Sequence, residues 1–92
     1  MSSAVRDNPA LSRFELDVAG VTAIAIYRLE NGVMTLTHTE VPREAREHGI
    51  GSKLVKGALE AARSRGLKVV PRCPFVSAYI DRHPEFQDLL AH

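Results

Sequence analysis

Three stretches in the first half of the chain have the hydrophobic spacing of β-strands. In residues 13–18, apolar and charged side chains alternate, which predicts a strand with one buried face. Residues 21–29 are apolar on both faces, which predicts a central strand. Residues 33–41 alternate again, with Met34, Leu36, His38 and Glu40 on one face and Thr35, Thr37 and Thr39 on the other. Turns at Ala19-Gly20 and Asn31-Gly32, the second a strong hairpin signal, predict an antiparallel meander.

The spacing becomes helical after a polar loop over residues 42–48. From residue 49 to residue 65, apolar positions recur every three or four residues, and Gly66 is placed to end the helix. A short strand over residues 67–70, a helix that begins after Pro74 and is interrupted at His83-Pro84, and helical turns over residues 85–90 are expected to follow. A strand–helix–strand unit crosses over right-handed, so its two strands should run parallel. The sequence therefore predicts a mixed α/β (α+β) fold, with a β-meander, a β-α-β unit and a C-terminal helix.

Composition limits the functions open to the chain. Its 92 residues suit one domain, which we expect over residues 13–92 after a flexible, polar N-terminal arm over residues 1–12. Twelve Lys and Arg balance eleven Asp and Glu, a net charge of +1 that argues against a nucleic-acid partner. No apolar run reaches the roughly 20 residues of a membrane span, and residues 1–9 lack the apolar stretch expected of a signal peptide. The single cysteine, Cys73, fits a reducing compartment, so we expect a cytoplasmic protein.

The segment Arg46-Glu47-His48-Gly49-Ile50-Gly51-Ser52 lies between a predicted strand and a predicted helix. The first N–H groups of a helix have no internal partner and attract anions, and glycines let an anion approach them. Lys53 and Lys56, in the following turns, would add positive charge. Two sharper phosphate motifs do not fit: Gly51-Ser52-Lys53 has the wrong order for a Walker loop, and Leu54 stands where the dinucleotide fingerprint needs a small residue. A phosphate site and a glycine-rich helix start without a ligand both remain open at this point.

Arg46-x-x-Gly49-x-Gly51 resembles Arg/Gln-x-x-Gly-x-Gly/Ala, the pyrophosphate loop of the GNAT N-acetyltransferase superfamily. The stretch from about Phe14 to Leu90 is similar to minimal GNAT-like proteins of this length. Three segments carry that closer match: His38-Thr-Glu-Val-Pro42, the glycine loop, and Val70-Pro-Arg-Cys-Pro-Phe-Val76 followed by Tyr79 and His83-Pro-Glu85. The resemblance implies a short GNAT fold in which the parallel strand pair is splayed.

The resemblance also implies acetyl-coenzyme A as the cofactor. Backbone amides from about Glu47 to Ser52 would bind its pyrophosphate, the strand edge near Glu40 and Val41 would pair with its pantetheine arm, and its thioester would lie near Cys73. The expected cofactor-binding residues are Val41, Arg46, Glu47, His48, Gly49, Ile50, Gly51, Ser52 and Lys53.

The chain departs from the superfamily pattern around the acceptor site. Only Ala19-Gly20 stands where helices usually follow the first strand and shape that site. Pro42 comes one residue early, and the usual Tyr-x-x-x-Gly-Phe ending is replaced by a segment that begins at Tyr79. The resemblance therefore implies the cofactor but not the acceptor.

Four residues are candidates for the chemistry of acetyl transfer, which needs proton movement and a stabilised oxyanion. His38 or Glu40 could relay a proton, and backbone N–H groups near Val41 could stabilise the oxyanion. Tyr79 could protonate the leaving thiolate, as a tyrosine often does in the superfamily. Cys73 could accept the acyl group and pass it on. Arg72 beside it would lower its pKa unless strand alternation points the two side chains apart. For each of the four a structural role remains open: solvated strand residues for His38 and Glu40, packing for Tyr79 and Cys73. No metal-ligand spacing is present.

We therefore expect an acetyl-coenzyme A-binding N-acetyltransferase that acetylates an amine of an unidentified small molecule or protein, as a monomer or weak homodimer. A coenzyme A-binding regulatory module without turnover is the alternative.

Overall fold

The structure is a computed structural model that describes residues 5–91. Its five-stranded sheet has the order β1-β2-β3-β4-β5, in which the first four strands are antiparallel and β4 and β5 are parallel. The strands are β1 (Arg6–Asn8), β2 (Arg13–Val18), β3 (Val21–Glu30), β4 (Val33–Glu40) and β5 (Lys68–Pro71). The predicted meander, parallel pair and mixed α/β class are confirmed.

The folded part of the chain begins earlier than the hydrophobic pattern predicts. Structure was expected from Arg13 onward, whereas β1 pairs with β2 ahead of it. Side chains fix both faces of this short strand: Arg6 forms ion pairs with Glu15 and Asp17, and Asp7 accepts a hydrogen bond of 2.6 Å from the Tyr27 hydroxyl. Charged partners far along the chain, rather than apolar alternation, hold β1 in place. Of the expected N-terminal arm, residues 1–4 lie outside the described residues.

Two α-helices and three 3-10 helices complete the fold. They are η1 (Pro9–Leu11), η2 (Arg43–His48), α1 (Ile50–Ser64), α2 (Pro74–Arg82) and η3 (Pro84–Leu89). The segment expected as a polar loop is thus the helix η2, and β5 is shifted by one residue from its expected position. Gly66 ends α1 as predicted, with the Leu67 N–H bonded to the Ala62 carbonyl at 2.9 Å. In residues 5–91, no helix is both long enough and apolar enough to cross a membrane.

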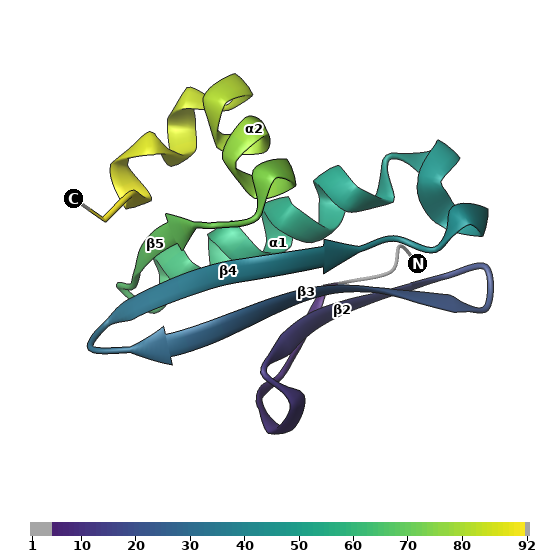
Figure 1. The fold of residues 1–92 in the computed structure, drawn as a ribbon, viewed down its shortest axis with the longest axis horizontal. Coiled ribbons are helices and arrows are strands. Elements are labelled where there is room, and N and C mark those ends of the chain that lie inside the picture. Colours follow the sequence, from purple (N-terminus) through teal and green to yellow (C-terminus); the bar gives the residue numbers. More distant parts are fainter. Residues whose placement is uncertain (1–4, 92) are drawn as a thin grey trace.

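The helices pack on one face of the sheet. Figure 1 shows α1 and α2 together beside β4 and β5. The apolar face of α1 and the inward side of α2 cover strand residues such as Leu16, Ala25, Leu36 and Val69, all of which are buried. The opposite face of the sheet has no buried apolar side chain among the described residues. One face therefore holds the core, and the other is accessible to ligands.

A β-bulge in β4 decides which side chains reach each face. Tyr27 pairs with Leu36, but the preceding residue of β3, Ile26, pairs with His38, so Thr37 is an extra residue in β4. After a bulge the alternation of side chains changes phase. Met34 and Leu36 thus share the helix-covered face with Thr39, which is opposite Ala25. The expectation that His38 and Glu40 share the face of Met34 and Leu36 is wrong, because period-two counting cannot register an extra residue.

Candidate functional site

The β4–β5 pair opens at its C-terminal end. Strand pairing ends at Leu36 and Pro71, and the Cys73 N–H makes a final bond of 3.0 Å to the Leu36 carbonyl. Beyond this point β4 continues to Glu40, while the other chain segment turns into α2 at Pro74. The backbone of β4 therefore has a free edge where the two segments diverge.

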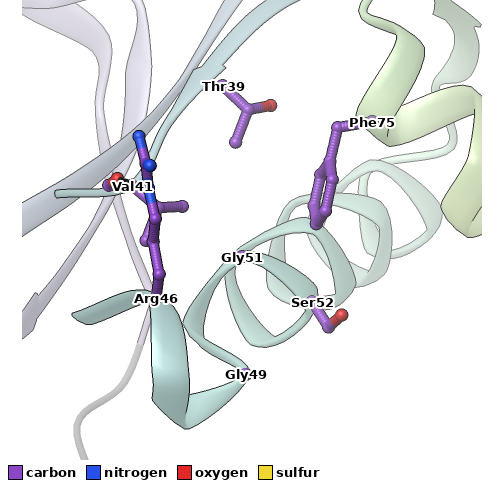
Figure 2. A pocket seen from close by; sticks show the side chains of 7 residues that line it. All are labelled: Thr39, Val41, Arg46, Gly49, Gly51, Ser52 and Phe75. Atoms are coloured by element: carbon purple, nitrogen blue, oxygen red, sulfur yellow. Dashed lines mark hydrogen bonds between the residues drawn. The ribbon is translucent and has the colours of Figure 1, made fainter. Parts of the chain in front are cut away.

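A cavity of about 360 Å³ lies at this opening. We call it the loop pocket; it is lined by Thr39, Val41, Arg46, Gly49, Gly51, Ser52 and Phe75. Figure 2 shows Thr39, Val41 and Arg46 on one side and Phe75 on the other, with Gly51 between them. Strand β4, the start of α1 and the start of α2 each contribute to its walls.

Glycine is required at the two positions of the loop pocket for different structural reasons. Gly49 has φ +65° and links η2 to α1 through a left-handed conformation that favours glycine. Gly51 lies beneath Phe75: a Cβ at residue 51 would come within 2.8 Å of the Phe75 Cζ atom. One glycine thus allows the turn, and the other allows an aromatic ring to lie against the first turn of α1.

The start of α1 lines the loop pocket through Gly49, Gly51 and Ser52. The Lys53 N–H bonds to the Gly49 carbonyl at 3.1 Å, so the helical ladder begins there, and the amides of the first turn precede it. Arg46 donates from Nε to the Val41 carbonyl at 2.9 Å, which fixes its guanidinium beside the end of β4. Partial positive charge and a fixed cation therefore lie at one pocket, a suitable arrangement for an anion.

Five of the nine residues expected to bind the cofactor line the loop pocket: Val41, Arg46, Gly49, Gly51 and Ser52. Ile50 belongs to the core, and Lys53 is exposed and does not line the cavity. The side chains of Glu47 and His48 lie outside the described part of the structure. Sequence reasoning missed Thr39 and Phe75 as lining residues, and for Thr39 the only signal, the bulge at Thr37, is invisible in the hydrophobic pattern.

Cys73 lies behind the loop pocket rather than in its wall. Its side chain is buried, with the residue 6% exposed, and Sγ is 3.5 Å from the Thr39 hydroxyl. Burial raises the pKa of the thiol, but the Thr39 hydroxyl and the backbone N–H groups of Val76, Phe75 and Thr39 outweigh it, so the net pKa is lowered. Arg72, expected to lower this pKa, is not among the groups that shift it. Hydrogen-bond donors thus favour the thiolate form of Cys73, and the Thr39 hydroxyl lies between this sulfur and the pocket.

His38 and Glu40 lie on the other face of β4. His38 Nε2 is 3.0 Å from Glu40 Oε2, and both side chains are more than half exposed, at 55% and 63%. They border a second cavity of about 530 Å³, the sheet-face pocket, which is lined by Arg13, Thr22, Ile24, His38, Thr39, Glu40, Val41, Pro42 and Arg46. The two pockets share Thr39, Val41 and Arg46, so they meet around the C-terminal end of β4.

Two comparisons with known proteins agree with this geometry. Residues 13–89 match the model of a family described as GCN5-related N-acetyl-transferase. The chain belongs to this family. It is also similar in structure to a GCN5-like, proposed N-acetyltransferase from Staphylococcus aureus that was solved by NMR, with a TM-score of 0.73 and 27% sequence identity over 95% of this chain and 86% of that chain. The resemblance seen in the glycine loop, and the fold that it implied, are therefore confirmed.

Tyr79 of this GCN5-related chain lines neither pocket and, unlike Cys73, is not hydrogen-bonded to a described residue that does. Its ring stacks on His83 with centroids 3.8 Å apart and lies 6.2 Å from Phe86, and it lines neither cavity. Burial, followed by the charges of Glu85 and Glu60, raises its pKa. The described residues contain no group of three or more metal-ligating side chains.

Proposed function

We propose that this GCN5-related protein binds acetyl-coenzyme A in the loop pocket and transfers the acetyl group to an amine that enters from the sheet-face pocket. The position of the loop pocket carries the proposal: it lies where β4 and β5 diverge, and Arg46, Gly49 and Gly51 of the recognised glycine loop line it. Membership of the family supports acetyl transfer as the reaction.

The residues present fit the cofactor in two ways. The first amides of α1 and the Arg46 guanidinium suit a pyrophosphate, which accepts hydrogen bonds from both kinds of donor. The free edge of β4 beyond Leu36 offers backbone groups to an amide-containing arm, as an added strand would use them. The charged groups of the loop pocket thus suit the pyrophosphate of the cofactor, and the free edge of β4 suits its amide-containing arm.

When bound, the cofactor supplies an activated acetyl thioester. The amine must lose a proton as its nitrogen bonds to the acetyl carbon, and the leaving sulfur must gain one as the carbon–sulfur bond breaks. His38 and Glu40, hydrogen-bonded to each other at the sheet-face pocket, can take the proton of the amine directly or through water. Tyr79 is left out as the acid because its ring is packed against His83, outside both cavities.

Cys73 offers a two-step route through the protein itself. Its thiolate would accept the acetyl group as a thioester, releasing coenzyme A, and the amine would then remove it. The lowered pKa and the contact with Thr39, which lines both cavities, support this route. The second candidate function is a coenzyme A-binding module without turnover. It is favoured by the strand-built acceptor side, where His38 and Glu40 are exposed and no helix of residues 5–91 covers them.

Acetyl-coenzyme A added at about one hundred times its dissociation constant should stabilise the protein by roughly 2.7 kcal/mol, measured by thermal unfolding. Incubation with a set of primary amines, followed by mass spectrometry of the products, then separates the enzyme from the module. Stabilisation with an acetylated amine supports the transferase. Stabilisation without any product favours the module, and the absence of stabilisation refutes the loop pocket as the cofactor site.

A further inference from the structure

Two rows of side chains cross the uncovered face of the sheet. Strand pairing aligns Arg13, Ile26 and His38 in one row and Glu15, Ile24 and Glu40 in the next. Adjacent strands are about 4.8 Å apart, so Arg13 and His38 stand about 10 Å from each other across β3. The sheet-face pocket lies between the ends of these rows, with Ile24 as an apolar contact.

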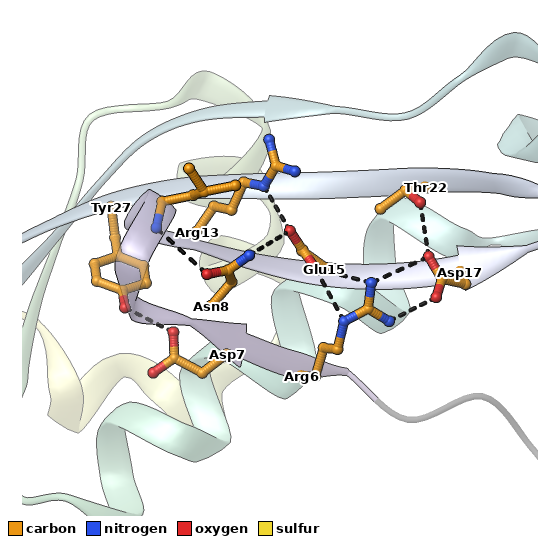
Figure 3. A network of polar contacts seen from close by, with 9 residues as sticks. Arg6, Asp7, Asn8, Arg13, Glu15, Asp17, Thr22 and Tyr27 are labelled. Atoms are coloured by element: carbon orange, nitrogen blue, oxygen red, sulfur yellow. Dashed lines mark hydrogen bonds and ion pairs between the residues drawn. The ribbon is translucent and has the colours of Figure 1, made fainter.

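A hydrogen bond from Nε holds Arg13 at one end of the sheet-face pocket. Its Nε donates to Glu15 Oε2 at 2.7 Å, and residues 5–91 provide no hydrogen-bond partner for its two terminal nitrogens. Glu15 is 4% exposed and is itself fixed by Arg6 Nε at 2.9 Å and Asn8 Nδ2 at 3.1 Å. Figure 3 shows Glu15 between the two arginines. The network therefore orients a guanidinium whose remaining donors can serve a ligand.

The other end of the pocket, where Arg46 donates to the Val41 carbonyl, carries an acid–base pair. Glu40 and His38 form a pair of 3.0 Å at the end of β4. A carboxylate beside an imidazole can hold an ammonium group and then receive its proton. Between the two ends lies Ile24, which would contact a hydrocarbon chain. The pocket thus has a guanidinium, an apolar middle and a proton-accepting pair in that order.

We infer that the acceptor is an ω-amino carboxylate, whose carboxylate binds Arg13 and whose amine lies at His38 and Glu40. The inference rests on the proposed function, because it assigns the substrate class of the same site. A guanidinium binds a carboxylate through a planar pair of donors. The separation of the two ends favours several methylene groups between the amine and the carboxylate, and so excludes an α-amine next to its own carboxylate.

The test compares three acceptors with acetyl-coenzyme A: 6-aminohexanoate, hexylamine, which lacks the carboxylate, and an amidated lysine peptide. We expect 6-aminohexanoate to have the lowest KM. Arg13→Gln should raise that KM roughly 10- to 100-fold, the effect of losing a charged hydrogen-bond pair, and leave the KM of hexylamine unchanged. Arg13→Lys keeps the charge beside Glu15 but lacks the paired donors of a guanidinium. Its KM for 6-aminohexanoate should lie between those of the wild type and Arg13→Gln.

Two matched variants control for indirect effects. Arg6→Gln weakens the Glu15 network without touching the sheet-face pocket, and Arg28→Gln removes an exposed arginine from β3 outside the pocket. Arg28→Gln should retain the wild-type KM for 6-aminohexanoate, whereas Arg6→Gln should raise it by less than Arg13→Gln does, because it loosens the network but keeps the guanidinium. If Arg6→Gln raises the KM as much as Arg13→Gln, Arg13 acts only through the network and the inference fails. It also fails if hexylamine or the lysine peptide is as good an acceptor as 6-aminohexanoate.

Binding is also measured without the cofactor, by NMR titration of 6-aminohexanoate into the free protein. Chemical-shift changes at β2 and β4 that Arg13→Gln abolishes would support the ligand class even if acetyl-coenzyme A did not bind. Cofactor binding and amine acetylation with no preference for the carboxylate would overturn the inference and leave the proposed function intact.

Discussion

Beyond Thr37, the two faces of β4 contribute to two different sites, although the residues involved are neighbours in one strand. Thr39 faces the helices and contacts buried Cys73, whereas His38 and Glu40 face outward from the uncovered side of the sheet. The loop pocket presents backbone amides, and the buried Cys73 thiol lies behind its Thr39 wall. The sheet-face pocket uses long charged side chains. A single bulge therefore separates a site whose donors are fixed by the fold from one whose donors are fixed by ion pairs.

Cofactor binding and acceptor choice should therefore change independently of each other. Substitutions on the helix-covered face should alter the cofactor or the acyl group, and substitutions on the uncovered face should alter the acceptor. The two sets should overlap only at Thr39, Val41 and Arg46, which line both cavities.

The largest expected effect separates the two faces through Cys73. Rapid acid quenching after mixing with acetyl-coenzyme A should trap one acetyl group on the protein, detected by intact-mass spectrometry and removed by hydroxylamine. Cys73→Ser should abolish this adduct completely and keep cofactor binding. Because only the thiolate attacks, the adduct should form faster as pH rises through the thiol pKa, which is lowered by its donors.

Direct transfer to the amine would give the contrary result. Cys73→Ala, which leaves only a small cavity, would then acetylate amines at the wild-type rate and no adduct would be trapped. Cys73 would in that case be a packing residue of the loop-pocket face.

A second prediction concerns Glu40, on the uncovered face of the sheet. Glu40→Gln should lower the rate of amine acetylation by about 100-fold, a typical loss for a proton-transfer group, and leave both cofactor affinity and the Cys73 adduct unchanged. Steady-state rates across pH, with the adduct measured in parallel, provide the check. Equal loss of adduct and product would mean that Glu40 acts on the loop pocket and that the faces are not independent.

A third prediction concerns the glycine beneath Phe75. Gly51→Val should remove the roughly 2.7 kcal/mol of stabilisation by acetyl-coenzyme A at one hundred times its dissociation constant, because the side chain fills the approach to the α1 amides. The new side chain also displaces the Phe75 ring. Phe75→Leu therefore serves as the control: a thermal shift lost in Gly51→Val but kept in Phe75→Leu assigns the loss to the amides.

If Phe75→Leu loses the shift as completely as Gly51→Val, the aromatic ring rather than the helix start holds the ligand. A normal shift in Gly51→Val would remove the loop pocket from the cofactor assignment altogether.

Much of the helix-covered face could be predicted from the sequence. Apolar periodicity located α1 and β2 to β4, and the spacing of Arg46, Gly49 and Gly51 located the loop, because local rules govern both. Gly66 could be assigned to the end of α1 for the same reason. These elements depend on neighbours in the chain.

The uncovered face could not be predicted in this way. Arg13, Thr22 and Ile24 line its pocket through cross-strand pairing, and Arg6 reaches Glu15 from a strand without an apolar signal. The bulge at Thr37 reversed the expected faces of β4 because strand pairing, rather than composition, creates it. Contacts between distant segments carry the information that a pattern along one segment lacks.

A fourth prediction tests the network behind the sheet-face pocket. Arg13, then Asn8, then Arg6 lower the pKa of Glu15 against the opposing effect of burial. Its carboxylate therefore stabilises the folded state above its ordinary pKa of 4.5, and this contribution is lost as pH falls through the lowered value. Glu15→Gln should melt below the wild type at pH 7, and the difference should shrink in acid.

Melting temperatures at a series of pH values provide the measurement. Glu30→Gln, at the exposed end of β3, is the matched control and should follow the wild type throughout. A constant difference between Glu15→Gln and the wild type at all pH values would show that Glu15 acts through shape rather than through charge.

The smallest expected effect concerns Lys53, an exposed residue of the first turn of α1. A cation near a helix N-terminus opposes the dipole, by about 0.3–1 kcal/mol at low salt, so Lys53→Gln should slightly raise the melting temperature of the free protein. The same change should weaken acetyl-coenzyme A binding a few-fold, because a cation near the pyrophosphate is lost. Both effects should fade as added salt screens exposed charges.

Lys56→Gln, one turn further on, should leave the free protein unchanged and weaken binding less, since the dipole effect is confined to the first turn. Calorimetric titrations at low and high ionic strength measure the binding, and thermal unfolding measures the free protein. A lower melting temperature for Lys53→Gln together with unchanged affinity would place Lys53 in the fold and not in the site. If Lys53→Gln makes the free protein more stable but weakens cofactor binding, Lys53 is a charge that destabilises the fold and favours anion binding.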